Sequence, residues 1–161
     1  MPKPAVALAA AGDEASGSAW VALADGNVRL VDMRASTSAA KWSAGVTTRT
    51  ITVSASGQEI ALGAADGTVM LFDVHKGSVR EQWRRSGGPV ECVSFAPGGR
   101  VLAGGEDGLP YLVDVSRGGH DAGLPVSELV FGNVEAVRAL RVSGDLVYMA
   151  GDGGVVRKYQ L

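Results

Sequence analysis

Residues able to do acid–base, nucleophilic or metal chemistry are sparse in this 161-residue chain. Its two histidines and one cysteine, His75, His120 and Cys92, are too few for a typical zinc site. No Gly-x-Ser-x-Gly elbow accompanies Asp73 and His75, so a serine hydrolase triad is not indicated. No glycine-rich stretch carries the Gly-Lys-Ser/Thr of a phosphate loop. The sequence therefore predicts no catalytic residue, no metal ligand and no cofactor.

One basic and aromatic cluster, Trp83, Arg84 and Arg85, has the chemistry of a binding site. Arginine and tryptophan are the residue types most enriched at the energetic centres of protein interfaces. The cluster, which Arg80 extends, could bind a phosphate group or an acidic partner. Glu81 dilutes its charge, however, and the solvent-facing side of an outer strand would show the same composition. Both interpretations stay open.

Charge and apolar patterning narrow the class further. A net charge of −2 with interspersed acids and bases disfavours a nucleic-acid binder, which usually has a basic excess. No apolar stretch approaches the roughly 18 residues of a membrane span. The run from Ala5 to Ala11 after Lys3 imitates a short signal peptide, but it also fits a first strand. We expect an intracellular protein, cytoplasmic or nuclear.

The elements that position these residues follow from an internal repeat. Four segments align, at residues 24–32, 65–73, 106–114 and 152–160, and each begins around an Asp-Gly dipeptide. Asp-Gly between apolar runs is a strong hairpin signal, because glycine takes positive φ and aspartate caps its own turn. The closing residues Asp32, Asp73, Asp114 and Gln160 are 41, 41 and 46 residues apart. This period predicts four-stranded propeller blades, which take about 40–45 residues each.

The repeat predicts about fifteen short strands and no helix. Strands before the Asp-Gly turns are expected at residues 20–23, 60–64, 101–104 and 146–150, and another strand follows each turn. Apolar strands that begin each repeat are expected at residues 5–11, 46–54, 90–96 and 134–143, with Cys92 as a small core residue. Short outer strands are expected at residues 39–43, 79–84 and 126–131.

These repeats resemble the WD40 family. Val31-Asp32, Phe72-Asp73, Val113-Asp114 and Tyr159-Gln160 stand where that family has its Trp-Asp dipeptide. Val-Ser-Phe-Ala-Pro-Gly-Gly at residues 93–99 looks like the signature of the family's first strand. The resemblance implies an all-β propeller of four WD40-like four-stranded blades and a protein–protein interaction module without catalytic activity.

The chain departs from the family at the residues of its buried hydrogen-bond network. No repeat has the Trp, and the Gly-His dipeptide is replaced by Ser43-Ala44, Arg85-Ser86 and Gly132-Asn133. In the family this His joins the turn Asp to the Trp. Without that network, Asp25, Asp66 and Asp107 are expected only to cap their turns.

The blades are expected to form one domain, residues 1–161, divided at about 4–44, 45–85, 86–132 and 133–161. No residues remain for the outer strand of the last blade, so an open or partial propeller is expected. Such an array exposes two apolar faces and an unpaired strand edge. Three completions stay open: a second copy that makes eight blades, a separate chain that completes the propeller, or a larger assembly or longer protein.

The leading functional interpretation is an interaction scaffold or a structural subunit of a complex. By resemblance, the face most often used for binding would carry Arg49, Glu91, Glu106, Asp107, Glu135 and Asp152. This acid-leaning set favours a protein partner of basic or mixed charge. Tyr159 and Leu161 are predicted to be covered where the open edge of the last strand meets another strand or blade.

The alternative interpretation is a propeller enzyme with an active site in the central channel. It would need convergent acids, histidines or metal ligands on the innermost strands. Those strands offer only Arg49, Glu91, Glu135, Arg138 and Arg141. The sequence therefore favours the scaffold.

Overall fold

Four antiparallel β-sheets make up the fold in the computed structural model, which describes residues 3–11, 17–116, 125–129 and 135–161. These described residues contain fifteen strands and no helix, which confirms the all-β prediction. The first three sheets have four strands each, and the fourth has three. The predicted shortfall of one outer strand is thus confirmed within the described ranges. No helix in the described part of the chain could cross a membrane.

Each sheet is one blade, and its strands follow the order of the sequence. Blade 1 comprises β1 (Ala5–Ala10), β2 (Ser18–Leu23), β3 (Asn27–Asp32) and β4 (Thr37–Ser43). Blade 2 comprises β5 (Thr48–Val53), β6 (Glu59–Ala64), β7 (Thr68–Asp73) and β8 (Ser78–Arg84). Blade 3 comprises β9 (Val90–Ala96), β10 (Arg100–Gly105), β11 (Tyr111–Asp114) and β12 (Val126–Glu128). Blade 4 comprises β13 (Val137–Ser143), β14 (Leu146–Gly151) and β15 (Val156–Gln160).

The hairpins between the second and third strands form as their Asp-Gly sequences predict. The backbone N–H groups of Asn27, Thr68 and Leu109 donate to the Asp Oδ1 two residues earlier, at 3.1, 3.0 and 3.1 Å. Gly67 has a φ of +90°, and a Cβ there would collide with the carbonyl oxygen of Ser86. Glycine is required at this turn because only a residue without Cβ permits both the backbone angle and the close approach.

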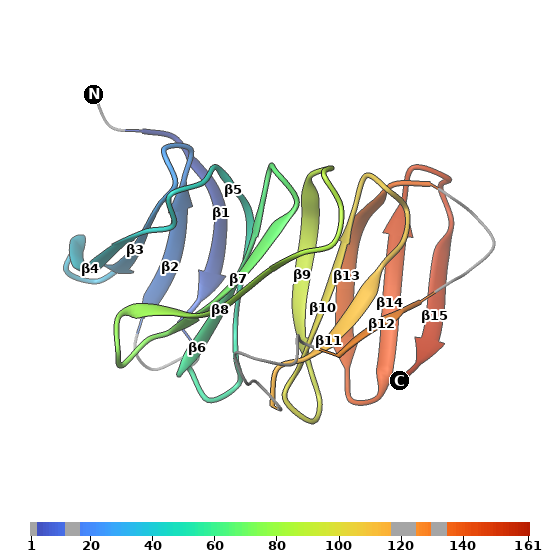
Figure 1. Ribbon diagram of the computed structural model, residues 1–161. Coiled ribbons are helices and arrows are strands. Elements are labelled where there is room, and N and C mark those ends of the chain that lie inside the picture. Colours follow the sequence, from blue (N-terminus) through green and yellow to red (C-terminus); the bar gives the residue numbers. More distant parts are fainter. Residues whose placement is uncertain (1–2, 12–16, 117–124, 130–134) are drawn as a thin grey trace.

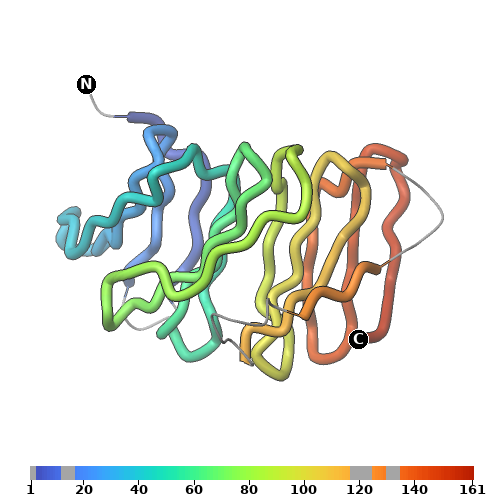
Figure 2. Tube along the Cα trace, viewed as in Figure 1, coloured from blue at the N-terminus to red at the C-terminus, as the bar shows by residue number. Residues whose placement is uncertain are grey.

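The blades stand in an open row, with β1–β4 at one end and β13–β15 at the other (Figure 1). The innermost strands contact one another in the order β1, β5, β9 and β13. The hairpins between second and third strands lie at the top of the view, and the first turns of blades 2 to 4 lie at the bottom (Figure 2). We call these the upper and lower edges.

Adjacent blades pack sheet against sheet through three apolar clusters. We call the side of a blade turned toward the next blade in sequence its forward face, and the opposite side its back face. Between blades 1 and 2, the Trp42 ring stacks on Trp20 at a centroid distance of 4.6 Å and on Phe72 at 5.8 Å. Between blades 2 and 3, Leu71 packs with Val101 and their neighbours. This burial of apolar faces is the main stabilising contribution to the array.

The third cluster joins blades 3 and 4 and contains the single cysteine. Cys92, Leu102 and Leu112 of blade 3 pack there against Val147 and Met149 of blade 4. Burial raises the pKa of the Cys92 thiol to about 12, so it stays protonated at neutral pH. Cys92 is a core residue, as its place in an apolar strand predicts.

Candidate interaction surface

Each of the four innermost strands has one β-bulge, and the extra residue of each bulge lies near the upper edge. The pairing of β1 with β2 shifts near the start of β1 and leaves Val6 outside the register. The same shift leaves out Arg49 in β5, Glu91 in β9 and Arg138 in β13. A bulge re-aims the side chain of its extra residue. The four residues therefore hold equivalent positions on adjacent blades, near the upper edge where these strands begin.

Three of these residues alternate in charge and form a chain of ion pairs across blades 2, 3 and 4. The Nη2 atom of Arg49 lies 2.5 Å from Oε1 of Glu91, and Nη1 of Arg138 lies 3.6 Å from the same oxygen. On its other side Arg138 donates to both carboxylate oxygens of Asp152, each at 2.8 Å. Such a bidentate pair has a defined orientation. We call Arg49, Glu91, Arg138 and Asp152 the upper charge network.

Hydrogen bonding keeps the end of this network charged. The side-chain hydrogen bond from Arg138 holds the pKa of the Asp152 carboxyl below its usual value of 3.8. The same bond raises the pKa of the Arg138 guanidinium. The two side chains are 44% and 54% exposed, so solvent screens their attraction. The network therefore presents oriented charge more than it stabilises the fold.

Glu106 and Glu135 lie exposed beside the upper charge network. Glu106 begins the hairpin between β10 and β11, and its charge adds to the raised pKa of Arg138. The Glu135 carboxylate lies against Gly153, in the hairpin that carries Asp152. Neither carboxylate forms an ion pair with a described residue. Together they supply the unpaired negative charge of this surface.

The structure thus gathers the residues predicted for the binding face at the upper edge, but it pairs three of their five acids with arginines. Glu91, Asp107 and Asp152 are each paired with an arginine. The predicted set omitted Arg138, although its position near the start of an inner strand matches those of Arg49 and Glu91. The bulges that aim these residues have no signal in the sequence.

Arg85 and Asp107 form a polar link between blades 2 and 3. The Arg85 guanidinium contacts the Asp107 carboxylate and donates to the Leu109 carbonyl oxygen and to Glu128 Oε1, both at 2.9 Å. It also lies over the Tyr111 ring, 5.0 Å from the centroid. The expectation that Asp107 only caps its turn was wrong, because Arg85, at the position of the family's Gly-His dipeptide, reaches the same aspartate.

The three residues of the predicted cluster, Trp83, Arg84 and Arg85, therefore have different environments in the structure. Trp83 packs against the apolar cluster between blades 2 and 3, and the Arg85 side chain is only 16% exposed. Arg84 is exposed, and its Nε donates to the Ser86 carbonyl oxygen at 3.2 Å. All three line a shallow groove with Val126 and Glu128 of β12. Two of the three side chains hold blades together.

The predicted edge residues Tyr159 and Leu161 face the interior. Both pack against the cluster between blades 3 and 4. The opposite face of β15 carries Val156 and Lys158, which are exposed. A partner on the forward face of blade 4 would meet these residues instead.

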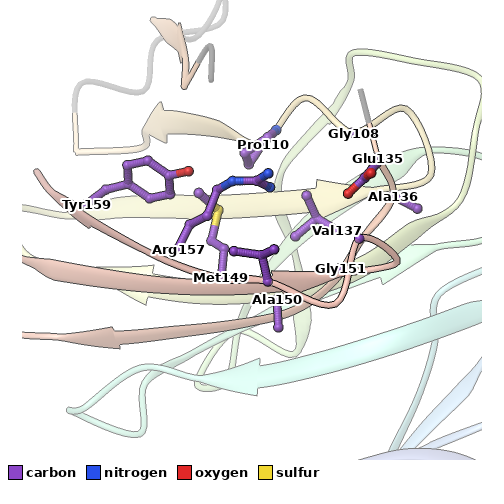
Figure 3. A pocket seen from close by; sticks show the side chains of 12 residues that line it. Gly108, Pro110, Glu135, Ala136, Val137, Met149, Ala150, Gly151, Arg157 and Tyr159 are labelled. Atoms are coloured by element: carbon purple, nitrogen blue, oxygen red, sulfur yellow. The ribbon is translucent and has the colours of Figure 1, made fainter. Parts of the chain in front are cut away.

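Two hollows bear on small-molecule binding. One lies between Pro110 of blade 3 and the Met149 side of blade 4, with Arg157, Tyr159 and Glu135 around it (Figure 3). Its volume of about 30 Å³ is roughly the space of one water molecule. The other is an open hollow along part of the innermost strands, where the described lining residues include one titratable side chain, Arg141. Within the described ranges, no three His, Cys, Asp or Glu residues could hold a metal ion.

Sheet order, blade packing and edge hairpins together define this chain as an open β-propeller of four WD40-like blades. A family model described as WD domain, G-beta repeat, matches residues 78–114, from β8 to the end of β11. The crystal structure of the computationally designed Ika4 protein matches with a TM-score of 0.80, covering 100% of this chain and 93% of that chain. At 17% sequence identity this likeness shows the fold alone. The comparison with curated proteins found no match.

Proposed function

We propose that this chain is a non-catalytic protein–protein interaction scaffold that binds a partner at its upper edge. The upper charge network carries the proposal. It places Arg49 and Arg138, each nearly half exposed, beside the unpaired carboxylates of Glu106 and Glu135. Rigid elements hold these charges, because the bulges belong to packed inner strands. A surface of both signs suits a protein partner of mixed charge.

The same proposal includes a role as a structural subunit of a larger complex, in which the partner stays bound permanently. The open faces of blades 1 and 4 favour it, because exposed apolar sheet faces usually become covered. The enzyme alternative has no specific support, since the described lining of the hollow along the innermost strands lacks an acid or a base other than Arg141.

Charge reversal at the upper edge tests the proposal. We expect Glu106→Lys and Glu135→Lys to lose the proteins that co-purify with the tagged wild-type chain from cells. The matched control is Asp145→Lys, an exposed acid in the lower-edge turn between β13 and β14. Quantitative mass spectrometry of the purified complexes gives the readout. Equal recovery from all three variants would contradict binding at the upper edge.

A further inference from the structure

The three contacts between blades repeat one geometry, which the two end blades leave incomplete. In each contact, a row of residues that are neighbours across the strands lies on the forward face of one blade. It meets a similar row on the back face of the next blade. Blades 2 and 3 meet through Thr52–Ala61–Leu71–Glu81 and Val93–Ala103–Tyr111–Glu128. On blade 4 the equivalent forward row is Arg141–Tyr148–Lys158, and on blade 1 the equivalent back row is Leu8–Val21–Arg29–Lys41. We call these two the end rows.

Two members of the end rows, Leu8 and Tyr148, are exposed where their equivalents are buried. Tyr148 is 37% exposed, whereas Leu102 at the same place in blade 3 is 0% exposed. Leu8 is 63% exposed, whereas Val93 is 7% exposed. The ends of the array therefore have the apolar surface of a blade contact without a neighbouring blade.

Each end row also carries two cations. Arg141 and Lys158 flank Tyr148, and Arg29 and Lys41 follow Val21 across the sheet. None of these four side chains has a hydrogen bond or ion pair with a described residue. The Nε atom of Arg29 is buried without an acceptor among the described residues. A buried donor costs free energy until it finds an acceptor.

Inside the array, two cations at the contact of blades 2 and 3 pair with carboxylates of the neighbouring blade. Arg85 of blade 2 pairs with Glu128 of blade 3, and Arg49 pairs with Glu91. Lys41 of blade 1 and Glu128 of blade 3 occupy equivalent places. Lys41 pairs with Arg29, and Glu128 pairs with Tyr111 at the same position of the strand register. By this geometry, Lys41 requires an acid on the blade that would precede it.

A second copy does not supply such an acid. With strands matched as in blades 2 and 3, closing the row with another copy would place Lys158 of one chain opposite Arg29 of the other, and Arg141 opposite Leu8. Like charges would then face each other, with no carboxylate in either row. Lys158 also holds the place of Leu71 and Leu112, which are both buried. Self-closure would bury an unpaired ammonium group, which is costly.

We propose that the end rows dock on blades that differ from this chain's own four, with sheet faces that carry carboxylates opposite these four cations. Their apolar residues would cover Leu8 and Tyr148, and their acids would pair with the lysines and arginines. The end rows lie on the sheet faces and not at the upper edge. This inference deepens the structural-subunit role, which rests on the same open faces, and it is separate from binding at the upper edge. Variants of Glu106 therefore leave it untouched.

The test uses a charge-reversed chain, R29E/K41E/R141E/K158E, as the acid-faced partner. Sedimentation velocity should show the wild-type chain and the reversed chain as monomers when each is alone. A mixture should form a one-to-one complex that weakens with added salt. The matched neutral chain, R29Q/K41Q/R141Q/K158Q, should bind wild type at least about 10-fold more weakly, because it lacks the complementary charge. Circular dichroism verifies that each chain is folded.

A second variant keeps the test decisive if the reversed chain folds poorly. In R141E/K158E, the carboxylate introduced at position 158 would lie opposite Arg29 of another copy, so this chain should dimerise by itself. Self-association of the wild-type chain as tight as any of these complexes would overturn the proposal in favour of a second copy. Folded R141E/K158E that stays monomeric would also overturn it, because the end rows would then not be docking surfaces.

Discussion

Arg138 links two carboxylates on different blades, and its hydrogen bonds lower the pKa of one of them, Asp152. It donates two hydrogen bonds to Asp152 of its own blade and lies 3.6 Å from Glu91 of blade 3. Arg49, in contrast, contacts Glu91 alone among the members of the upper charge network. The two arginines are therefore matched residues for separating the effect on Asp152 from a general change of charge.

We predict that Arg138→Gln raises the pKa of Asp152 toward its ordinary value of 3.8. The control Arg49→Gln should leave that pKa low. NMR titration of the Asp152 carboxyl carbon measures both. Because the folded-state pKa lies below the unfolded one, the linked stability is present above about pH 4. It is lost as the pH falls through the folded pKa. An unchanged Asp152 pKa in Arg138→Gln would contradict the assigned cause.

Among the elements, the hairpin between β6 and β7 is closely enclosed by its neighbours. Its Gly67 combines a φ of +90° with a backbone contact to Ser86, which lies between β8 and β9. Gly45 has a φ of +71° but open space where a Cβ would stand. A comparison of the two glycines therefore separates the cost of backbone strain from the cost of a steric collision.

We predict that Gly67→Ala destabilises the chain by more than about 2 kcal/mol, since left-handed strain of about 1 kcal/mol adds to a backbone collision. Gly45→Ala should cost only the strain, about 1 kcal/mol. Urea unfolding followed by circular dichroism gives both values. Equal costs for the two variants would show that the turn can move away from Ser86.

At the scale of the whole molecule, the stability of the array depends on the three contacts between blades. The contact between blades 2 and 3 combines a fully buried leucine, Leu71, with the arginine link from Arg85 to Asp107. The open back face of blade 1 carries a leucine too, Leu8, which is 63% exposed. The same substitution can therefore be compared inside a contact and outside one.

We predict that Leu71→Ala costs about 2–5 kcal/mol of unfolding free energy, because it leaves a cavity between two sheets. Leu8→Ala should change stability by less than about 0.5 kcal/mol. Denaturant unfolding of the purified chain measures both. A large loss for Leu8→Ala would mean that the open face is covered in solution by another copy, against the inference from the end rows.

The sequence by itself determined the number of blades, the strand order and the hairpins. Asp25, Asp66 and Asp107 hydrogen-bond within their own turns, and each following glycine supplies a positive φ, so these contacts need no distant residue. The period of these turns then sets which strands pair. The missing outer strand of blade 4 followed from the same count.

Only the tertiary structure decided which side chains meet. Arg85 reaches Asp107 and Glu128 because two separate sheets pack face to face, and Tyr159 turns inward because blade 3 covers one face of β15. The bulges that bring Arg49, Glu91 and Arg138 together arise from strand registers that no local motif announces. The physical reason is the distance along the chain over which each interaction acts. Turn chemistry acts over a few residues, whereas the partner of a charged side chain depends on how separately formed sheets are stacked.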